Sequence, residues 1–149
     1  MCYREHMRTE ESGHRSAARQ PYERFQAWSA CHDLALAVYR ATQRWPKAEL
    51  YGLTSQARRA ATSAAINIAE GAAKRGPREL RRYLDISLGS LGELSYILRL
   101  SRDLEFGPKE TFGELEALRD HASRVTWGLY SAVSRSDRPG KSRTSVLDT

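Results

Sequence analysis

Residues 51–71 read YGLTSQARRAATSAAINIAEG, an alanine-rich run that contains no proline. Alanine has the highest intrinsic helix propensity, so the run predicts one continuous helix. Small and medium apolar residues recur in it mostly at steps of three and four: Leu53, Ala57, Ala60, Ala61, Ala64, Ala65 and Ile68. This spacing gathers them on one side of the helix, where small side chains allow a second helix to approach closely.

Three proline-containing breaks divide the flanking sequence into further helical segments. The breaks are Trp45-Pro46, Gly76-Pro77 and Gly107-Pro108. A residue before proline is displaced from the α region, whereas proline itself suits the first turn of a helix. Helices are therefore predicted at about residues 22–44, 52–74, 77–104 and 109–134. Short connections favour antiparallel neighbours, so the predicted fold is all-α, an up-down-up-down antiparallel four-helix bundle.

One domain with a polar tail at each end accounts for the 149 residues. Residues 1–20 and 135–149 hold few large apolar side chains, so both are predicted to be disordered tails. The bundle is predicted to span residues 21–134.

Signals of export and of membrane insertion are missing from the sequence. No apolar run approaches the roughly 18 to 20 residues of a membrane span, and the N-terminus lacks the apolar core of a secretory signal. The positions of Cys2 and Cys31 do not suggest a structural disulfide. A cytoplasmic protein with no membrane partner is therefore expected.

Residues 77–104 carry two adjacent apolar stripes, which together are wider than one partner groove requires. The second stripe contains Tyr83, Ile86, Ile97 and Leu100. Apolar surface beyond the needs of the core is typical of subunit contacts, so a homo-oligomer is predicted to form there. Gly89 and Gly92 stand inside the same helix at a cost of about 1 kcal/mol each relative to alanine. A close backbone contact is expected to explain them.

Basic residues are concentrated in one part of the chain. The net charge is +6. Residues 54–82 contain seven Lys/Arg and two Glu, whereas residues 83–134 contain five Lys/Arg and eight Asp/Glu. This distribution favours an anionic partner, of which RNA or DNA is the commonest. The alternative is a solvated basic surface with no ligand.

The candidate nucleic-acid-binding residues are Arg58, Arg59, Lys74, Arg75, Arg78, Arg81 and Arg82. Phosphate contacts from such residues give affinity that falls with salt, and little base specificity. Arg58 and Arg59 fit the group least well, because one of them should point toward a neighbouring helix.

Asn67, Glu70 and Glu93 are polar residues that could form a site between the second and third helices. Di-metal bundles combine glutamates with Glu-x-x-His pairs, but neither glutamate here has a histidine three residues later. We therefore expect a structural network in which Arg58 or Arg59 pairs with one of the two glutamates and fixes the helix register. An enzyme that uses Glu70 and Glu93 is the weaker alternative, because it needs a cavity where the sequence supplies small residues.

The motifs of common catalytic, metal and nucleotide sites do not occur in the sequence. It contains no CxxC or HxxxH pair, no GxSxG elbow, no Walker loop and no Rossmann fingerprint. Cys31 and His32 are adjacent, and adjacent side chains on a helix point about 100° apart. No catalytic residue, metal site or cofactor is therefore predicted.

Aromatic residues could serve either the interior or a nucleic acid. They include Trp28, Trp45, Trp127, Tyr39, Tyr83, Tyr96 and Tyr130. Most fall at the spacing of helical core or interface positions, so packing is their predicted use. Stacking on the bases of a single strand is the alternative.

Three ordered motifs resemble one known group of proteins. They are YGLTSQARRAA at residues 51–61, NIAEG at residues 67–71 and GSLGEL at residues 89–94, with Trp28 and Trp45-Pro46 also in place. Over roughly residues 22–110, the chain is similar to bacterial four-helix-bundle proteins encoded in intervening sequences of large-subunit ribosomal RNA genes. The same fold family includes accessory proteins of diversity-generating retroelements, which bind a reverse transcriptase and nucleic acid. The resemblance implies a homo-oligomer, a pentameric barrel of bundles with a basic surface.

The charge distribution and the resemblance lead to one functional hypothesis. The protein is predicted to be a non-enzymatic oligomeric scaffold that binds nucleic acid, or a nucleoprotein partner, where the second and third helices join. A role as a reverse-transcriptase accessory protein would fit the resemblance. The alternative is a scaffold for protein partners alone, with no nucleic-acid binding.

Overall fold

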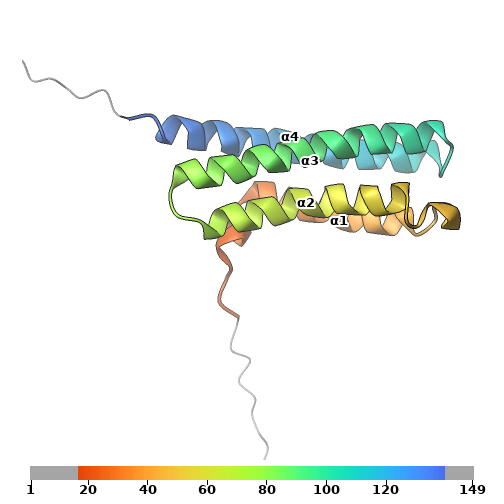
Figure 1. Ribbon diagram of the computed structural model, residues 1–149, viewed down its shortest axis with the longest axis horizontal. Helices are drawn as coiled ribbons and strands as arrows, with labels where there is room; N and C mark the ends of the chain where they lie inside the picture. Colours follow the sequence, from red (N-terminus) through yellow and green to blue (C-terminus); the bar gives the residue numbers. More distant parts are fainter. Residues whose placement is uncertain (1–16, 140–149) are drawn as a thin grey trace, which may run out of the picture.

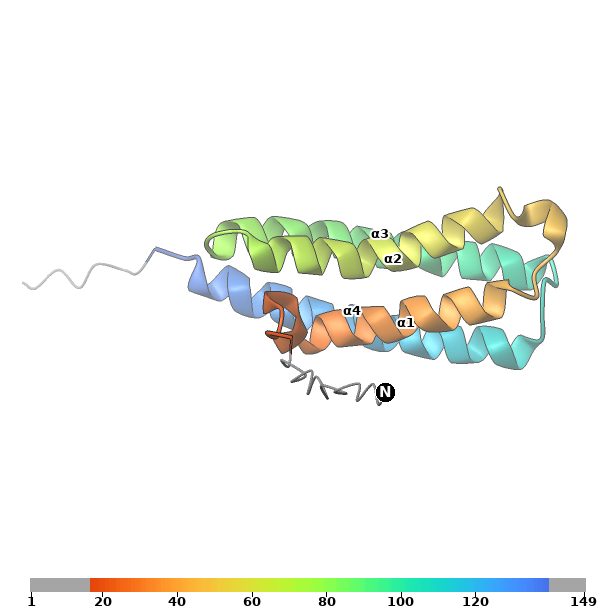
Figure 2. The ribbon, with the colours of Figure 1, turned by 90° about the horizontal axis from the view of Figure 1, so that it is seen from below.

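Four long helices pack side by side in the computed structural model, which describes residues 17–139 (Figure 1). They are α1 (Gln26–Thr42), α2 (Leu53–Ala73), α3 (Pro77–Asp103) and α4 (Lys109–Ser136), with two short 3-10 helices, η1 (Pro21–Arg24) and η2 (Lys47–Glu49). Successive helices run in opposite directions, and each packs against two others, in the order α1, α2, α3, α4 around the bundle (Figure 1, Figure 2). The described residues contain no strand. The predicted all-α, up-down-up-down bundle is confirmed.

The length and hydropathy of the helices bear on whether one could span a membrane. Within residues 17–139, none of them combines the length and the apolar character that crossing a bilayer requires.

The first long helix begins later than the sequence predicts. Phe25 has extended backbone angles, φ −92° and ψ 123°, so that η1 is separate and α1 starts only at Gln26. A reciprocal cap holds η1, because the backbone N–H of Gln20 donates to the Glu23 carboxylate over 2.7 Å. This local cap outweighs the helical spacing of the first apolar residues.

The last helix ends two residues later than predicted, at Ser136. Beyond it, the backbone N–H of Asp137 donates to the Val133 carbonyl over 3.1 Å, and the Asp137 carboxylate lies 3.2 Å from the Arg81 guanidinium. Contact with α3 thus extends α4 into a sequence whose polar composition suggested a tail. Residues 1–16 and 140–149 of the two predicted tails lie outside the described residues.

The core combines large side chains from α1 and α3 with small ones from α2. The largest buried residues of α1 and α3 are Leu34, Val38, Leu84, Leu91, Leu94 and Leu98. α2 contributes Ile68 and the buried alanines Ala57, Ala60, Ala61 and Ala64. At Gly71, a Cβ would lie 2.8 Å from the Cβ of Tyr83, closer than real side chains approach. Small residues on α2 therefore bring α2 and α3 into close contact, as the sequence predicts.

The two interior glycines of α3 have a different environment. A Cβ placed on Gly89 or Gly92 would meet nothing within 4 Å, and both residues are exposed. The expectation that a close backbone contact explains them is therefore wrong for contacts within residues 17–139. The close contact between α2 and α3 instead requires Gly71 of α2, where a Cβ would collide with Tyr83.

The prediction that Ile97 lies on an oligomer interface is wrong, because this side chain is only 4% exposed and belongs to the core. α3 packs against both α2 and α4, so its buried arc is wide enough to include this position. Of the other predicted interface residues, Ile86 is 43% exposed, and Tyr83 and Leu100 are half-buried. For these three, a contact between copies of the chain stays a prediction.

Candidate nucleic-acid interface

The turn between α2 and α3 is short, and its sequence determines its shape. Lys74 leaves α2 with extended backbone angles of φ −82° and ψ 165°, and Gly76 follows with a φ of +83°. Glycine adopts such a positive φ without strain, and Pro77 then starts α3 with a φ already suited to a helix. The turn therefore fixes the positions of the basic residues around it.

Five basic residues surround this turn. We call them the basic end: Lys74, Arg75, Arg78, Arg81 and Arg82. Lys74, Arg75 and Arg78 are exposed, and within residues 17–139 they make no ion pair. The positive charge of these three side chains is therefore uncompensated by the described part of the protein.

The other two arginines of the basic end are partly held by contacts within the bundle. Arg81 pairs with Asp137 of the α4 terminus over 3.2 Å. Arg82 lies 3.6 Å from the Glu79 carboxylate, and its guanidinium lies 4.9 Å from the centroid of the Tyr83 ring. Exposed pairs of this kind contribute little free energy, so Arg82 can exchange its partner for another anion at small cost.

The N-terminus of α3 adds a second source of positive potential to the basic end. Its N-cap, Gly76, has no side chain to accept hydrogen bonds from the first backbone N–H groups. The helix dipole places partial positive charge at the same point, where it disfavours the cation of Arg78 in the first turn. Glu79 offsets part of this charge. An anion bound at the turn would offset more of it.

Three further basic residues lie at the same end of the bundle, which the charge pattern along the sequence does not predict. They are Arg24 on η1, and Arg135 and Arg138 at and just beyond the end of α4. In both views, α4 ends and η1 begins at the end that carries the α2–α3 turn (Figure 1, Figure 2). The up-down-up-down order could have revealed them, because it returns the end of the fourth helix to the level of this turn.

Arg58 and Arg59 do not join the basic end. Arg59 precedes Lys74 by 15 residues, which is about 22 Å along the axis of α2. Arg58 points toward α1, where its Nε donates to the Thr42 hydroxyl over 2.9 Å and its guanidinium lies 4.7 Å from the Tyr39 ring centroid. The seven predicted nucleic-acid-binding residues thus form two separate groups.

The expected ion pair between α2 and α3 does not form among the described residues. Glu70 and Glu93 are exposed, and neither belongs to any of the ion pairs found within residues 17–139. Glu93 lines a shallow hollow between α2 and α3 together with Arg59, but Glu70 does not. That hollow therefore offers no paired-carboxylate site for acid–base chemistry.

Serines, rather than charged residues, link α2 to α3. Ser87 Oγ donates to the Ala64 carbonyl over 2.8 Å, and the hydroxyls of Ser63 and Ser90 lie 2.9 Å apart. Asn67 joins them through its amide, which donates to the Ser63 carbonyl over 2.8 Å. A hydroxyl finds a partner at such a seam without the desolvation cost of a charge, which explains why serines replace the predicted pair.

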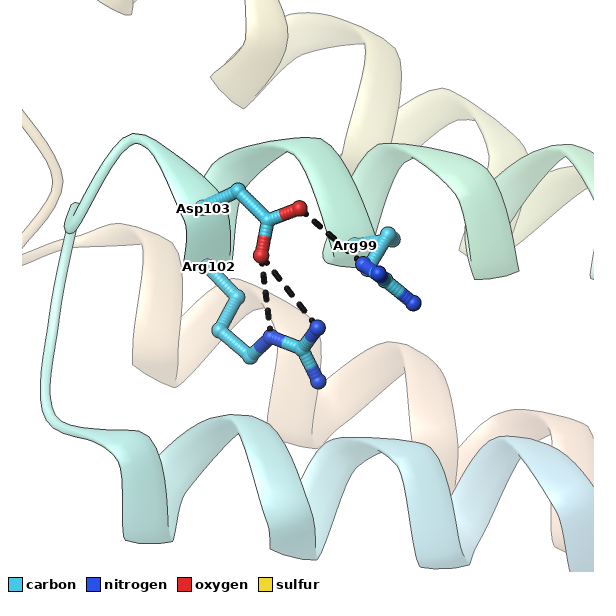
Figure 3. Close-up of polar contacts among 3 residues, drawn as sticks. All are labelled: Arg99, Arg102 and Asp103. Carbon is cyan, nitrogen blue, oxygen red and sulfur yellow. Dashed lines mark hydrogen bonds and ion pairs between the residues drawn. The ribbon is translucent and has the colours of Figure 1, made fainter.

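A second charged cluster, at the far end of α3, is compensated within itself. The carboxylate of Asp103 accepts hydrogen bonds from Arg99 Nε over 3.0 Å and from Arg102 Nη2 over 3.2 Å (Figure 3). The hydrogen bond from Arg99, supported by Arg102, holds the pKa of Asp103 below its ordinary value. Since Asp103 engages both arginines, this cluster offers less free positive charge than the basic end.

The contacts of Cys31 and His32 are packing contacts within the bundle. The Sγ of Cys31 lies 3.8 Å from the Thr126 hydroxyl, and burial raises the pKa of this thiol to about 11. A thiol that stays protonated is neither a good nucleophile nor a metal ligand. The ring of His32 stacks on Trp28 with 5.0 Å between centroids. The part of the chain that the structure describes holds no cluster of His, Cys, Asp or Glu suited to a metal ion.

Known proteins resemble the chain in sequence pattern and in fold. The pattern of the family described as 23S rRNA-intervening sequence protein matches residues 23–128. No functionally curated protein matches the sequence. A crystal structure of a protein with unknown function from the S23 ribosomal protein family of Bacteroides thetaiotaomicron is similar, with a TM-score of 0.58 and 19% identity. The match covers 72% of this chain and 97% of that chain, and at this identity it supports the fold alone. Because the family pattern spans most of the bundle, the chain belongs to the family of 23S rRNA-intervening sequence proteins.

Proposed function

We propose that the protein is a non-enzymatic oligomeric scaffold that binds the phosphate backbone of nucleic acid through the basic end. The observation that carries the proposal is the group of exposed cations around the α2–α3 turn. Lys74, Arg75 and Arg78 have no ion-pair partner among residues 17–139. A polyanion would supply the partners that the described bundle does not.

The local backbone supports a phosphate in particular as the ligand. The N-terminus of α3 has no side-chain cap, and free N–H groups at a helix N-terminus favour phosphate binding. Arginine side chains add bidentate hydrogen bonds to phosphate oxygens. Both kinds of contact read the backbone of the nucleic acid and not its sequence.

The oligomeric part of the proposal depends on the outer face of α3. Tyr83, Ile86 and Leu100 leave part of their apolar surface open in the single chain. A symmetric assembly that covers this face would present several basic ends together, which raises avidity for a long polyanion. In the cytoplasm, the partner would be RNA, DNA or a nucleoprotein. The resemblance suggests a complex that contains a reverse transcriptase as one such nucleoprotein.

The test compares two double variants that remove the same amount of charge. Arg75→Gln with Arg78→Gln changes the basic end, whereas Arg40→Gln with Arg44→Gln removes exposed charges at the opposite end of the bundle. Fluorescence anisotropy measures binding of a generic labelled RNA across a range of salt concentrations. If two phosphate contacts are lost, the slope of log K against log salt should decrease by roughly 1.4 to 1.8. The control variant should retain the wild-type slope.

Equal slopes in both double variants would show that only total charge matters and would refute a localised interface. A second candidate function, a scaffold for protein partners alone, is favoured by exposed apolar side chains of α2 and α3. They are Ile66, Ile86 and Tyr96, and Leu104 directly after α3 is exposed as well. If the unmodified protein shows no salt-sensitive binding to RNA or DNA, this second function replaces the first.

A further inference from the structure

One aromatic side chain that the spacing assigns to packing lies largely on the surface. Trp127 on α4 is 59% exposed, whereas Trp45 is 6% exposed between the rings of Phe106 and Phe112. Trp127 stacks on Tyr130, one helical turn along α4, with 5.4 Å between ring centroids and 20° between ring planes. Burial in the bundle therefore accounts for Tyr130 better than for Trp127.

The aromatic pair adjoins the basic end. Tyr130 lines a hollow between α3 and α4 together with Arg78, Arg81, Arg82, Glu79 and Asp85. Trp127 does not itself line the hollow, but it stacks on Tyr130, which does, and it lies three residues farther from the α2–α3 turn along α4. An extended ligand that follows the hollow would meet the arginines first and the aromatic pair next.

The charged side chains that line the hollow differ in how free they are to bind a phosphate. Arg81 is engaged by Asp137, whereas Arg78 is unpaired among the described residues and Arg82 makes only an exposed contact with Glu79. The carboxylate of Asp85 faces the same space and disfavours a phosphate near it. Phosphates are therefore favoured at Arg78 and Arg82, on the side of the hollow nearest the turn.

We infer that the hollow and the Trp127–Tyr130 stack beside it select single-stranded nucleic acid, with one unpaired base stacked on Trp127 and phosphates of the same strand on Arg78 and Arg82. This inference rests on the proposed function, which by itself would accept single and double strands alike. In a duplex, both faces of a base are covered by its neighbours, so only an unpaired base can stack on a protein ring. An exposed tryptophan stacked on a partly buried tyrosine, beside the unpaired Arg78 and the weakly held Arg82, resembles the combination that single-strand grooves use.

The test uses Trp127→Ala in the full chain and three labelled ligands of equal length: a single-stranded RNA, its duplex, and a strand without bases. Affinity for the single strand should fall by roughly 5- to 150-fold, the effect of losing one base–aromatic stack. Affinity for the duplex and for the abasic strand should not change, because both present only phosphates. Trp127→Phe should retain part of the affinity for the single strand.

Tyr96→Ala is the matched control, because Tyr96 of α3 is 66% exposed and neither lines the hollow nor stacks on Tyr130. Its affinities for all three ligands should equal those of the unmodified protein. Quenching of tryptophan fluorescence by the single strand, lost in Trp127→Ala, would report the stack directly.

The outcomes separate this inference from the proposed function. If Arg75→Gln with Arg78→Gln weakens binding of all three ligands while Trp127→Ala weakens none, only the single-strand inference is overturned. If neither variant changes binding of any ligand, the proposed function is overturned as well. If light scattering shows that Trp127→Ala changes the number of subunits, Trp127 is covered by another copy of the chain and the inference is overturned.

Discussion

Replacing glycine by alanine should have opposite effects at Gly71 of α2 and at Gly89 of α3. Both substitutions gain about 1 kcal/mol from the higher helix propensity of alanine. At Gly89 the new Cβ meets nothing within 4 Å, so the protein keeps this gain. At Gly71 the new Cβ would lie 2.8 Å from the Cβ of Tyr83 and 3.1 Å from Cδ1 of Leu80.

The magnitude at Gly71 follows from which atom is crowded. The Cβ of Tyr83 is attached directly to the backbone of α3, so it cannot rotate away, and the two helices have to separate. Overpacking of this kind costs about 1 to 3 kcal/mol, which leaves a net destabilisation of up to about 2 kcal/mol after the propensity gain. The two variants should therefore differ by about 1 to 3 kcal/mol in free energy of unfolding. For a domain of this size, that corresponds to a difference in Tm of roughly 3 to 15 °C.

Thermal and urea unfolding followed by circular dichroism would measure the difference. All variants should be compared at one protein concentration, so that any association between chains contributes equally. Gly92→Ala is the control for an open position on α3, because its Cβ would also meet nothing within 4 Å. A Tm that rises as much for Gly71→Ala as for Gly89→Ala would refute the close approach of α2 and α3.

Three further predictions concern the core, the buried thiol and the far charged cluster. Ile97→Ala should lower the free energy of unfolding by about 2 to 5 kcal/mol, because it leaves a cavity in the core. Ile86→Ala should lower it by less than about 1 kcal/mol, because Ile86 is partly exposed. Equal losses of the two variants in urea unfolding would contradict the burial of Ile97. In a Cys2→Ser background, Cys31 should resist a thiol reagent at neutral pH until the protein unfolds, because burial raises its pKa to about 11; labelling at the rate of a free thiol would disprove this. Asp103→Asn should lower stability at neutral pH, and the gap from the unmodified protein should close in acid. This sign follows because a carboxylate with a lowered pKa stabilises only while ionised, so a gap that persists in acid would count against the Arg99 contact.

The sequence predicts the helices well because their limits are set locally. Proline and glycine mark the three long-helix connections, and the spacing of apolar residues identifies the buried sides of the four helices. The start of α1 and the end of α4 were the exceptions. The cap between Gln20 and Glu23 competes with helical spacing at the first, and contact with α3 extends the helix at the second. The resemblance to one family is also confirmed, because the pattern of that family matches residues 23–128.

The candidate site is harder to predict, because it depends on how the helices pack. Whether Ile97 faces the core or a partner depends on how much of α3 its neighbours α2 and α4 cover, which the period of α3 alone does not determine. Arg135 lies at the basic end only because α4 returns to it. Arg58 lies 16 residues before Lys74 on the same helix, so its distance from that end can be read from the sequence, whereas its contacts with Thr42 and Tyr39 depend on how α1 packs. The surface position of Trp127 could not be predicted either, since a residue at the margin of an apolar arc fits a buried or an open environment equally well.

The serine contacts between α2 and α3, made by Ser63, Ser87 and Ser90, also bear on the order in which the chain folds. The Ser87–Ala64 bond closes a loop of 23 residues, whereas the Cys31–Thr126 contact between α1 and α4 closes one of 95. Short loops cost less chain entropy to close, so the α2–α3 hairpin should form early and the α1–α4 seam last. The thiol of Cys31 lies on that last seam. It can therefore serve as a built-in reporter, which becomes reactive whenever α1 and α4 part while the hairpin beside them stays folded.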